Sequence, residues 1–190
     1  MVGGLILAAG EGSRFGPSGK LLQKLDGRPL LEHAIRAQVA VDELSPIVVV
    51  LGSHAGELLA TVQFGRAVPV LCSRWQDGLS ASLSTGLHAL AGAHRVLVTL
   101  GDVPGITPAA IRRMLDAPDG ARAGYGGRPG HPVVLGAAQI ERLDQAGGDS
   151  GAGSLLAARP LIECSDLCSG LDVDTPTDLE AIRNAARAVV

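Results

Sequence analysis

Four short apolar runs, separated by stretches with helical character, constrain the fold of this chain more than any other feature. The runs are continuously apolar and rich in β-branched residues: Gly4–Ala8, Ile47–Leu51, Val68–Cys72 and Val96–Leu100. Such runs are typical of parallel strands that are buried on both faces. The predicted helices are Leu30–Val41, Ala55–Val62, Ser80–Leu90, Pro108–Leu115 and Pro176 to about Ala188. The sequence therefore predicts an α/β fold, with a mostly parallel sheet covered by helices on both faces.

The rhythm of strands and helices changes between about residues 118 and 153. This section is dense in glycine and contains one short apolar run, Pro132–Leu135. No linker, internal repeat or low-complexity tract divides the chain. We therefore expect a single domain over residues 1–190, in which section 118–153 is an insertion or covers the substrate.

Composition excludes several classes of function. The net charge of −3 and the four aromatic residues argue against a nucleic-acid binder. No apolar run approaches the ~20 residues that a membrane-spanning helix needs, and the first residues do not resemble a signal peptide. We expect a cytoplasmic protein that contacts neither nucleic acid nor membrane. Cys72, Cys164 and Cys168 are an odd number without a second metal-ligand pair, so we interpret them as reduced structural thiols.

The segment after the first predicted strand is a glycine-rich loop with two cations. Gly10, Gly12, Gly16 and Gly19 accompany Arg14 and Lys20. Bare backbone and positive charge together suit a phosphate group. The dinucleotide pattern fails because its third glycine position is Phe15, and the P-loop pattern fails because Leu21 stands where a hydroxyl belongs. The loop is therefore a phosphate-binding candidate of another type.

Carboxylates follow two extended segments. Asp102 comes directly after the run Val96–Leu100, at the edge where open α/β sheets bind ligands. Asp172 and Asp174 would point to one face if their segment is extended. A hard cation such as Mg²⁺ takes such carboxylates together with substrate phosphates. The alternative is that these residues only close turns.

Two further segments are candidates for polar ligands. Residues 75–87, from Trp75 to Leu87, open a predicted helix with several hydroxyls, which suits either a polar ligand or simple capping by Ser80. Within that helix, Gly86 suggests close packing or close approach of a ligand. His131 lies in a Gly/Pro-rich loop before Pro132–Leu135, where a structural role and a role near the substrate are both open.

Six segments in a characteristic order carry a family resemblance. They are Leu7-Ala8-Ala9-Gly10 with Arg14 and Lys20-Leu21-Leu22, then residues 78–83 with Gly86-Leu87, residues 101–104, 129–133, 148–152 and 172–176. In this order and spacing they resemble the small nucleotidyltransferases that attach a nucleotide to the pterin of the molybdenum cofactor. The likeness is greatest to the molybdenum cofactor cytidylyltransferases, and it runs from Leu5 to about Ile182.

The resemblance implies a three-layer Rossmann-like fold of the nucleotide-diphospho-sugar transferase type. It also implies transfer of a nucleoside monophosphate from an NTP to a pterin phosphate or another small phosphate acceptor. The implied catalytic residues are Arg14, Lys20 and Asp102, and the implied ligands of Mg²⁺, or alternatively Mn²⁺, are Asp102, Asp174 and Asp172. The implied nucleotide-binding residues are Leu7, Ala8, Ala9, Gly10, Gly12, Arg14, Lys20, Gly78, Ser80 and Ser82. His131 would lie near the acceptor, and a molybdoenzyme that receives the product is an expected partner.

The choice of nucleotide follows from the same comparison. Ala8-Ala9-Gly10 resembles the pyrimidine-using members, whereas guanylyl-transferring relatives usually carry Leu-Ala-Gly-Gly, so CTP is favoured over GTP. Three residues separate Gly16 from Lys20, where relatives commonly have two, and this bears on the placement of Lys20. The alternatives are a cytidylyl- or uridylyltransferase for a sugar or polyol phosphate, and a non-catalytic nucleotide- or cofactor-binding chaperone.

Overall fold

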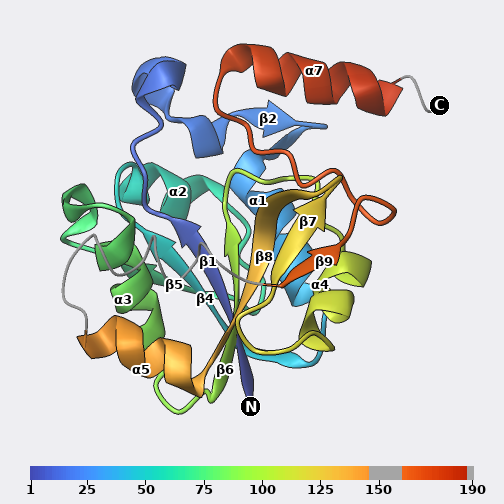
Figure 1. Ribbon diagram of the computed structural model, residues 1–190. Coiled ribbons are helices and arrows are strands. Elements are labelled where there is room, and N and C mark those ends of the chain that lie inside the picture. The colour runs from blue at the N-terminus through green and yellow to red at the C-terminus, as the bar shows by residue number, and fades with distance from the viewer. Residues whose placement is uncertain (146–159, 188–190) are drawn as a thin grey trace.

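A seven-stranded sheet organises the computed structural model, which describes residues 1–145 and 160–187 (Figure 1). The strand order is β5-β4-β1-β6-β8-β7-β9. The strands are β1 (Val2–Ala8), β4 (Leu44–Leu51), β5 (Val68–Leu71), β6 (Arg95–Leu100), β7 (Arg122–Tyr125), β8 (Arg128–Gly136) and β9 (Leu161–Glu163). Strands β5, β4, β1 and β6 run parallel, β8 is antiparallel to both β6 and β7, and β9 is parallel to β7.

Helices cover both faces of the sheet and make a three-layer fold (Figure 1). One face carries α1 (Leu30–Val39), α2 (Ala55–Thr61) and α4 (Pro108–Leu115), whose buried residues join one hydrophobic cluster. The other face carries α3 (Leu79–Ala89) and α5 (Ala137–Gln145), which pack on a second cluster. The prediction of a Rossmann-like α/β fold is therefore confirmed.

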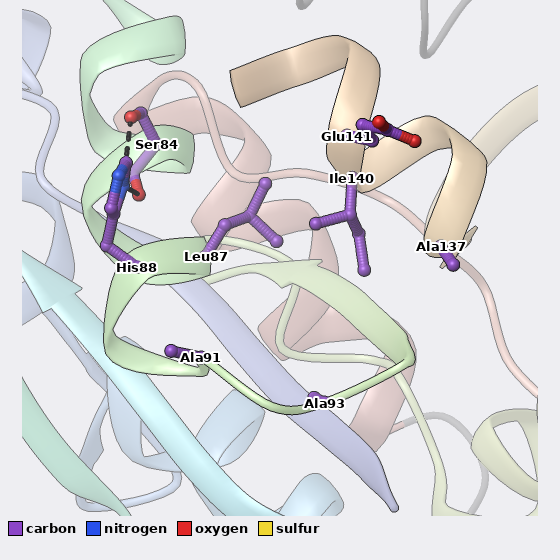
Figure 2. A pocket seen from close by; sticks show the side chains of 8 residues that line it. All are labelled: Ser84, Leu87, His88, Ala91, Ala93, Ala137, Ile140 and Glu141. Carbon is purple, nitrogen blue, oxygen red and sulfur yellow. Dashed lines mark hydrogen bonds between the residues drawn. The ribbon is translucent and has the colours of Figure 1, made fainter. Parts of the chain in front are cut away.

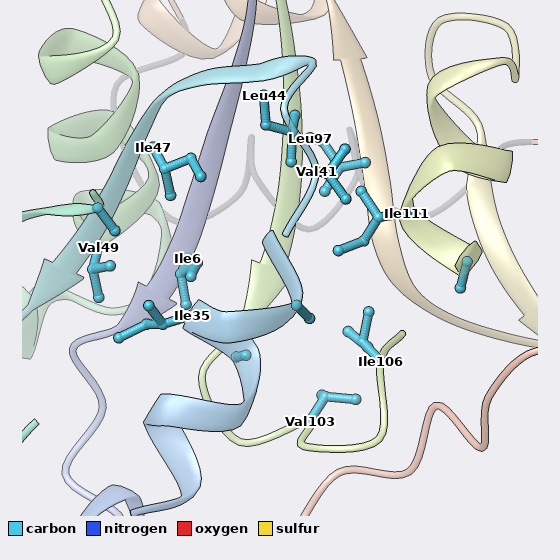
Figure 3. Packing of buried hydrophobic residues seen from close by; sticks show 14 of the residues in the cluster. Ile6, Ile35, Val41, Leu44, Ile47, Val49, Leu97, Val103, Ile106 and Ile111 are labelled. Atoms are coloured by element: carbon cyan, nitrogen blue, oxygen red, sulfur yellow. The ribbon is translucent and has the colours of Figure 1, made fainter. Parts of the chain in front are cut away.

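The continuous apolar character of the strands comes from burial on both sides. In β1, Ile6 and Ala8 face the first cluster, while Leu5 and Leu7 face the second. Figure 3 shows Ile6 among the strand, helix and loop residues of the first cluster. All four predicted strands are present, and their observed ends lie within a few residues of the predicted ends. This core holds the carboxyl ends of β1, β4 and β6 rigidly at one edge.

Several short elements lie above that edge. The loop after β1 forms the 3₁₀ turns η1 (Ser13–Ser18) and η2 (Lys20–Leu22), followed by the small ribbon of β2 (Lys24–Leu25) and β3 (Arg28–Pro29). A further 3₁₀ turn, η3 (Trp75–Asp77), precedes α3. The last helix, α7 (Pro176–Arg187), packs on the ribbon through a third cluster: Phe15, Leu25, Leu30, Val173, Leu179 and Ile182.

The described part of section 118–153 differs from the expected insertion. Residues 122–136 form the β7–β8 hairpin, which is part of the central sheet. Its turn places Gly126 (φ 60°) and Gly127 (φ 79°) in the left-handed region, as tight hairpin turns require. These two glycines are the signal that identifies the hairpin in the sequence. Residues 146–153, including the motif at 148–152, lie outside the described residues.

Candidate active site at the carboxyl edge of the sheet

The glycine-rich loop places Lys20 over the ends of β1 and β6. Gly12 has φ 60°, and a Cβ at this position would lie 2.7 Å from the Cβ of Lys20. A glycine is therefore needed for the two parts of the loop to approach each other. Phe15 anchors the loop from above because it packs against the cluster that contains Val173 and Leu179. Arg14 remains exposed.

Lys20 joins two carboxylates from distant parts of the chain. Its Nζ lies 2.5 Å from Oδ2 of Asp102 and 3.1 Å from Oδ1 of Asp174. The side chains of Lys20 and Asp102 are 14% and 19% exposed, whereas that of Asp174 is 51% exposed. Burial lowers the pKa of Lys20, but hydrogen bonding to Asp102 and Asp174, together with their charges, outweighs burial and raises it. Lys20 is therefore a fixed cation at neutral pH.

Backbone contacts position both carboxylates. Asp102 follows β6, and its carbonyl accepts a hydrogen bond of 2.9 Å from the amide of Val173. The segment then turns into α7 through a capping box: the amide of Thr175 donates to Oδ2 of Asp178 at 2.7 Å, and the amide of Asp178 donates to Oγ1 of Thr175 at 3.3 Å. The helix start predicted at Thr175-Pro176 is thus present. It holds Asp174, whose amide also donates to Asp178 at 3.1 Å.

The remaining charged candidates are arranged around this group. Arg14 Nη1 lies 3.9 Å from Oδ2 of Asp174, at the exposed rim. Asp172 is exposed and separated from Asp174 by buried Val173, so both carboxylates lie on one side of their segment, as predicted. Within the described ranges, however, Asp172 has no ion pair with Lys20. The structure thus brings together Asp102 and Asp174, with Asp172 to one side.

A pocket of about 280 Å³ adjoins Asp102 on the α3 face of the sheet. The residues that line it are Leu7, Ala9, Gly10, Trp75, Gly78, Leu79, Ser82, Leu100 and Asp102. Five of the expected nucleotide-binding residues, Leu7, Ala9, Gly10, Gly78 and Ser82, therefore lie together in one hollow. Their binding role stays a prediction, but their placement beside Lys20 and Asp102 fits it.

The other expected nucleotide-binding residues do not line this pocket. The Ala8 side chain belongs to the core of the opposite face, which leaves its backbone as the part near the strand end. Gly12 supports Lys20 instead. Ser80 lies inside α3, which begins at Leu79 with Gly78 as its N-cap, so capping by Ser80 is wrong. Gly78 has φ 97°, and this left-handed backbone lets the chain enter the helix at the pocket wall.

His131 lies at the same edge of the sheet, brought there by antiparallel β8. Its Nδ1 is 3.4 Å from the carbonyl oxygen of Val98 in β6. Burial lowers the pKa of His131, partly opposed by this hydrogen bond, and the nearby charge of Arg122 lowers it further. The charges of Asp102 and Asp172 act in the opposite direction. The imidazole is thus neutral at pH 7, beside the expected metal ligands.

The candidate segment of residues 75–87 contributes two more wall residues. Trp75 and Leu79 line the pocket, and Leu79 is 46% exposed although it is apolar. Sequence reasoning missed Tyr125, which donates to the carbonyl oxygen of His131 at 2.5 Å and lies 3.4 Å from the Sγ of Cys168. No local pattern identifies Tyr125, because its partner Cys168 is distant in the sequence and reaches it only through the segment that follows β9.

Other expectations have structural outcomes. Cys72, Cys164 and Cys168 are free thiols, as interpreted. A Cβ at Gly86 would meet the Leu5 side chain and lie 3.0 Å from Cγ2 of Val50, so close packing explains this glycine. A second hollow of about 420 Å³ lies between α3 and α5, and neither Asp102 nor Asp174 lines it (Figure 2). No helix within residues 1–145 and 160–187 is both long and apolar enough to cross a bilayer.

Comparisons with known proteins agree with this arrangement. The model of the MobA-like NTP transferase domain matches residues 4–163. Nicotine blue oxidoreductase of Paenarthrobacter nicotinovorans is 33% identical over 189 residues, which cover 92% of each protein. A nucleotidyl transferase from Methanothermobacter thermautotrophicus superposes with a TM-score of 0.83 at 26% identity, covering 100% of this chain and 99% of that one. The Rv0371c homologue from Mycobacterium sp. strain JC1 gives 0.81 at 28% identity, covering 100% and 98%.

Proposed function

The chain belongs to the MobA-like NTP transferase family and is a nucleotidyltransferase, and we propose that it transfers a nucleoside monophosphate from CTP to the phosphate of molybdopterin or the molybdenum cofactor, releasing pyrophosphate. The observation that carries this proposal is the group of Lys20, Asp102 and Asp174 beside a pocket at the carboxyl edge of the sheet. This edge is where open α/β sheets bind ligands.

The transfer needs positioning and charge neutralisation more than a protein nucleophile. The acceptor phosphate oxygen attacks the α-phosphorus of the nucleotide, the bond to the β-phosphate oxygen breaks, and pyrophosphate leaves. Lys20 and Arg14 are the cations that face this charge. A phosphate acceptor is already ionised at neutral pH, since its second pKa is about 6. No strong general base is therefore needed, and a neutral His131 suits a binding role near the acceptor.

Asp102 and Asp174 are suited to hold a divalent cation, Mg²⁺ or alternatively Mn²⁺. Oδ1 of Asp102 is buried and has no hydrogen-bond partner in the described part of the chain, so it is an acceptor that no protein group there uses. Mg²⁺ is commonly held by one or two carboxylates together with substrate phosphates. This pattern fits the described residues, among which no group of three or more His, Cys, Asp or Glu could form a metal site alone. When bound, the cation would neutralise charge on the leaving pyrophosphate.

The pocket favours a small base. Ala9 lines it with a Cβ where guanylyl-transferring relatives usually carry glycine, and a Cβ restricts how closely a base can approach. Ser82 is buried in the wall and offers a hydroxyl to the base. These features favour CTP over GTP. A molybdoenzyme that takes up the product remains the proposed partner.

Two other activities have specific support. A sugar or polyol phosphate could replace the pterin phosphate, because the proposed chemistry needs only an ionised acceptor. The full-length similarity to nicotine blue oxidoreductase also raises an oxidoreductase activity, since that relative carries the name of such an enzyme. Membership in a transferase family argues against the non-catalytic chaperone.

One experiment separates these activities. Pyrophosphate release is measured with CTP, GTP, UTP and ATP, each with and without molybdenum cofactor, and in parallel with a panel of sugar and polyol phosphates. We expect release with CTP that depends on the cofactor. Turnover only with a sugar phosphate would overturn the proposed acceptor, and a change in the oxidation state of nicotine blue without any pyrophosphate release would favour the oxidoreductase.

A further inference from the structure

The ammonium of Lys20 occupies the space between the two proposed metal ligands. Its Nζ contacts Asp102 at 2.5 Å and Asp174 at 3.1 Å. Two carboxylates that face each other repel unless a cation lies between them. In this structure the cation is Lys20, which is 14% exposed and therefore well shielded from solvent.

The proposed function requires the same ammonium elsewhere. Transfer from an NTP places Lys20 against phosphate oxygens and a divalent cation against Asp102 and Asp174. Lys20 already uses Oδ2 of Asp102 and Oδ1 of Asp174, and a divalent cation on the other oxygens of the same carboxylates would lie close to the ammonium, where two positive charges repel. Tight binding of the cation between the two carboxylates therefore requires the ammonium to move away.

The local structure allows the side chain of Lys20 to move but not its backbone. Gly12 lies close to the Cβ and backbone of Lys20, since a Cβ added at Gly12 would lie 2.7 Å from the lysine Cβ and 3.0 Å from the lysine nitrogen. The four-carbon stem beyond Cβ is flexible. Arg14, at 69% exposure and 3.9 Å from Asp174, is too peripheral to take over the contact with the more shielded Asp102.

We propose that Lys20 holds the divalent-cation position between Asp102 and Asp174 until nucleotide phosphates draw it away, so that phosphate and divalent cation bind cooperatively. This rests on the proposed nucleotidyl transfer. Coupling of this kind is reciprocal: phosphate raises the affinity for the cation, and the cation raises the affinity for phosphate. The site thus takes up its divalent cation together with the nucleotide and binds it weakly alone.

The test measures Mn²⁺ binding without nucleotide, so its readout is independent of turnover. Free Mn²⁺ is followed by electron paramagnetic resonance during titration of the full chain. We expect weak binding by the wild type and at least tenfold tighter binding by Lys20→Met, which keeps the stem and removes the charge. Lys20→Gln, which can still donate hydrogen bonds to both carboxylates, should also bind more tightly than the wild type. It serves as the second neutral variant if Lys20→Met folds poorly.

Matched controls separate competition at the site from a general loss of positive charge. Lys24 in β2 is the other lysine of the sequence and is exposed, so Lys24→Met should bind Mn²⁺ like the wild type. Adding Asp102→Asn to Lys20→Met should abolish the gain. Equal Mn²⁺ affinity of the wild type and both folded Lys20 variants would overturn the proposal, as would an equal gain in Lys24→Met. Failure of the proposed function would instead appear as no pyrophosphate release by the wild type with any nucleotide.

Discussion

Helix α3 borders two hollows, and their difference shows what marks a functional site in this fold. Its first residues, with Leu79 and Ser82, line the smaller hollow of about 280 Å³ beside Asp102. Its later residues, with Leu87 and His88, line the larger hollow of about 420 Å³ against α5 (Figure 2). The larger hollow is bordered mainly by small and apolar side chains, whereas the smaller one adjoins the charges of Lys20, Asp102 and Asp174. The volume of a hollow is therefore a poorer guide to the functional site here than the charges beside it.

The direction of α3 explains part of this difference. The N-terminus of a helix presents unpaired N–H groups and partial positive charge, while its C-terminus presents carbonyl oxygens and partial negative charge. Gly78 and Leu79 put the favourable end at the smaller hollow, and Ala91 and Ala93 line the larger one just beyond the other end. The start of α3 therefore adds N–H groups and partial positive charge at the smaller hollow, whereas the end of α3 lies toward the larger one.

The largest expected effect is at the smaller hollow. Asp102→Ala removes the carboxylate that contacts Lys20 and the proposed metal ligand. Loss of a single preorganised electrostatic group costs about 10²–10³-fold in kcat, and we expect at least that loss in pyrophosphate release. Circular dichroism should show an unchanged fold. A loss of less than tenfold in a folded variant would show that Asp102 is not the catalytic carboxylate.

The next effect is on stability and concerns the part of α3 between the two hollows. Gly86→Val places a side chain against Leu5 and Val50, where little space exists. Overpacking of this kind typically costs about 1–3 kcal/mol, so the midpoint of urea denaturation should fall. The matched control is Gly56→Ala in α2, an exposed helical glycine with open space around it, which should not destabilise the protein. Unchanged stability of Gly86→Val would show that the helix can move away from the sheet.

A smaller effect is expected at His131, on the proposed acceptor side of the site, and it concerns how the free energy of unfolding depends on pH. The pKa of His131 is lowered in the folded protein, so the unfolded chain takes up this proton at higher pH than the folded one. The free energy of unfolding should then fall as the pH drops through about 6.5. His131→Asn should flatten this decrease, measured by urea denaturation at several pH values between 7.5 and 5.5. An unchanged slope relative to the wild type would mean that His131 takes up its proton equally in both states.

The smallest effect is expected at the larger hollow. His88 is exposed, and its ring contacts the carbonyl oxygen of Ser84 at 2.8 Å (Figure 2). His88→Ala should change kcat/KM of nucleotidyl transfer by less than about twofold, or about 0.4 kcal/mol in the barrier, because His88 does not line the hollow beside Asp102. A large loss of activity would make the larger hollow part of the functional site and reverse the comparison.

Much of the fold was predictable because its signals are local. The runs that became β1, β4, β5 and β6 are apolar on both faces, and the Thr-Pro starts of α4 and α7 are present as predicted. The β7–β8 hairpin was missed because β7 is short and because both strands carry arginine and glycine, such as Arg122 and Arg128. Only the paired Gly126-Gly127 marks its turn. Its place between β6 and β9 depends on partners distant in sequence.

The sequence by itself determined the alternating fold, the glycine-rich loop and the identity of the charged candidates, because hydrophobic periodicity and glycine placement act over a few residues. Only the tertiary structure decided that Lys20 lies between Asp102 and Asp174, while Asp172 forms no ion pair with Lys20 in the described part of the chain. It also decided that Ala9 faces the pocket and Ala8 the opposite core. The physical reason is that the end of β6, the start of β8 and the segment before α7 meet through long-range pairing, which no local pattern encodes.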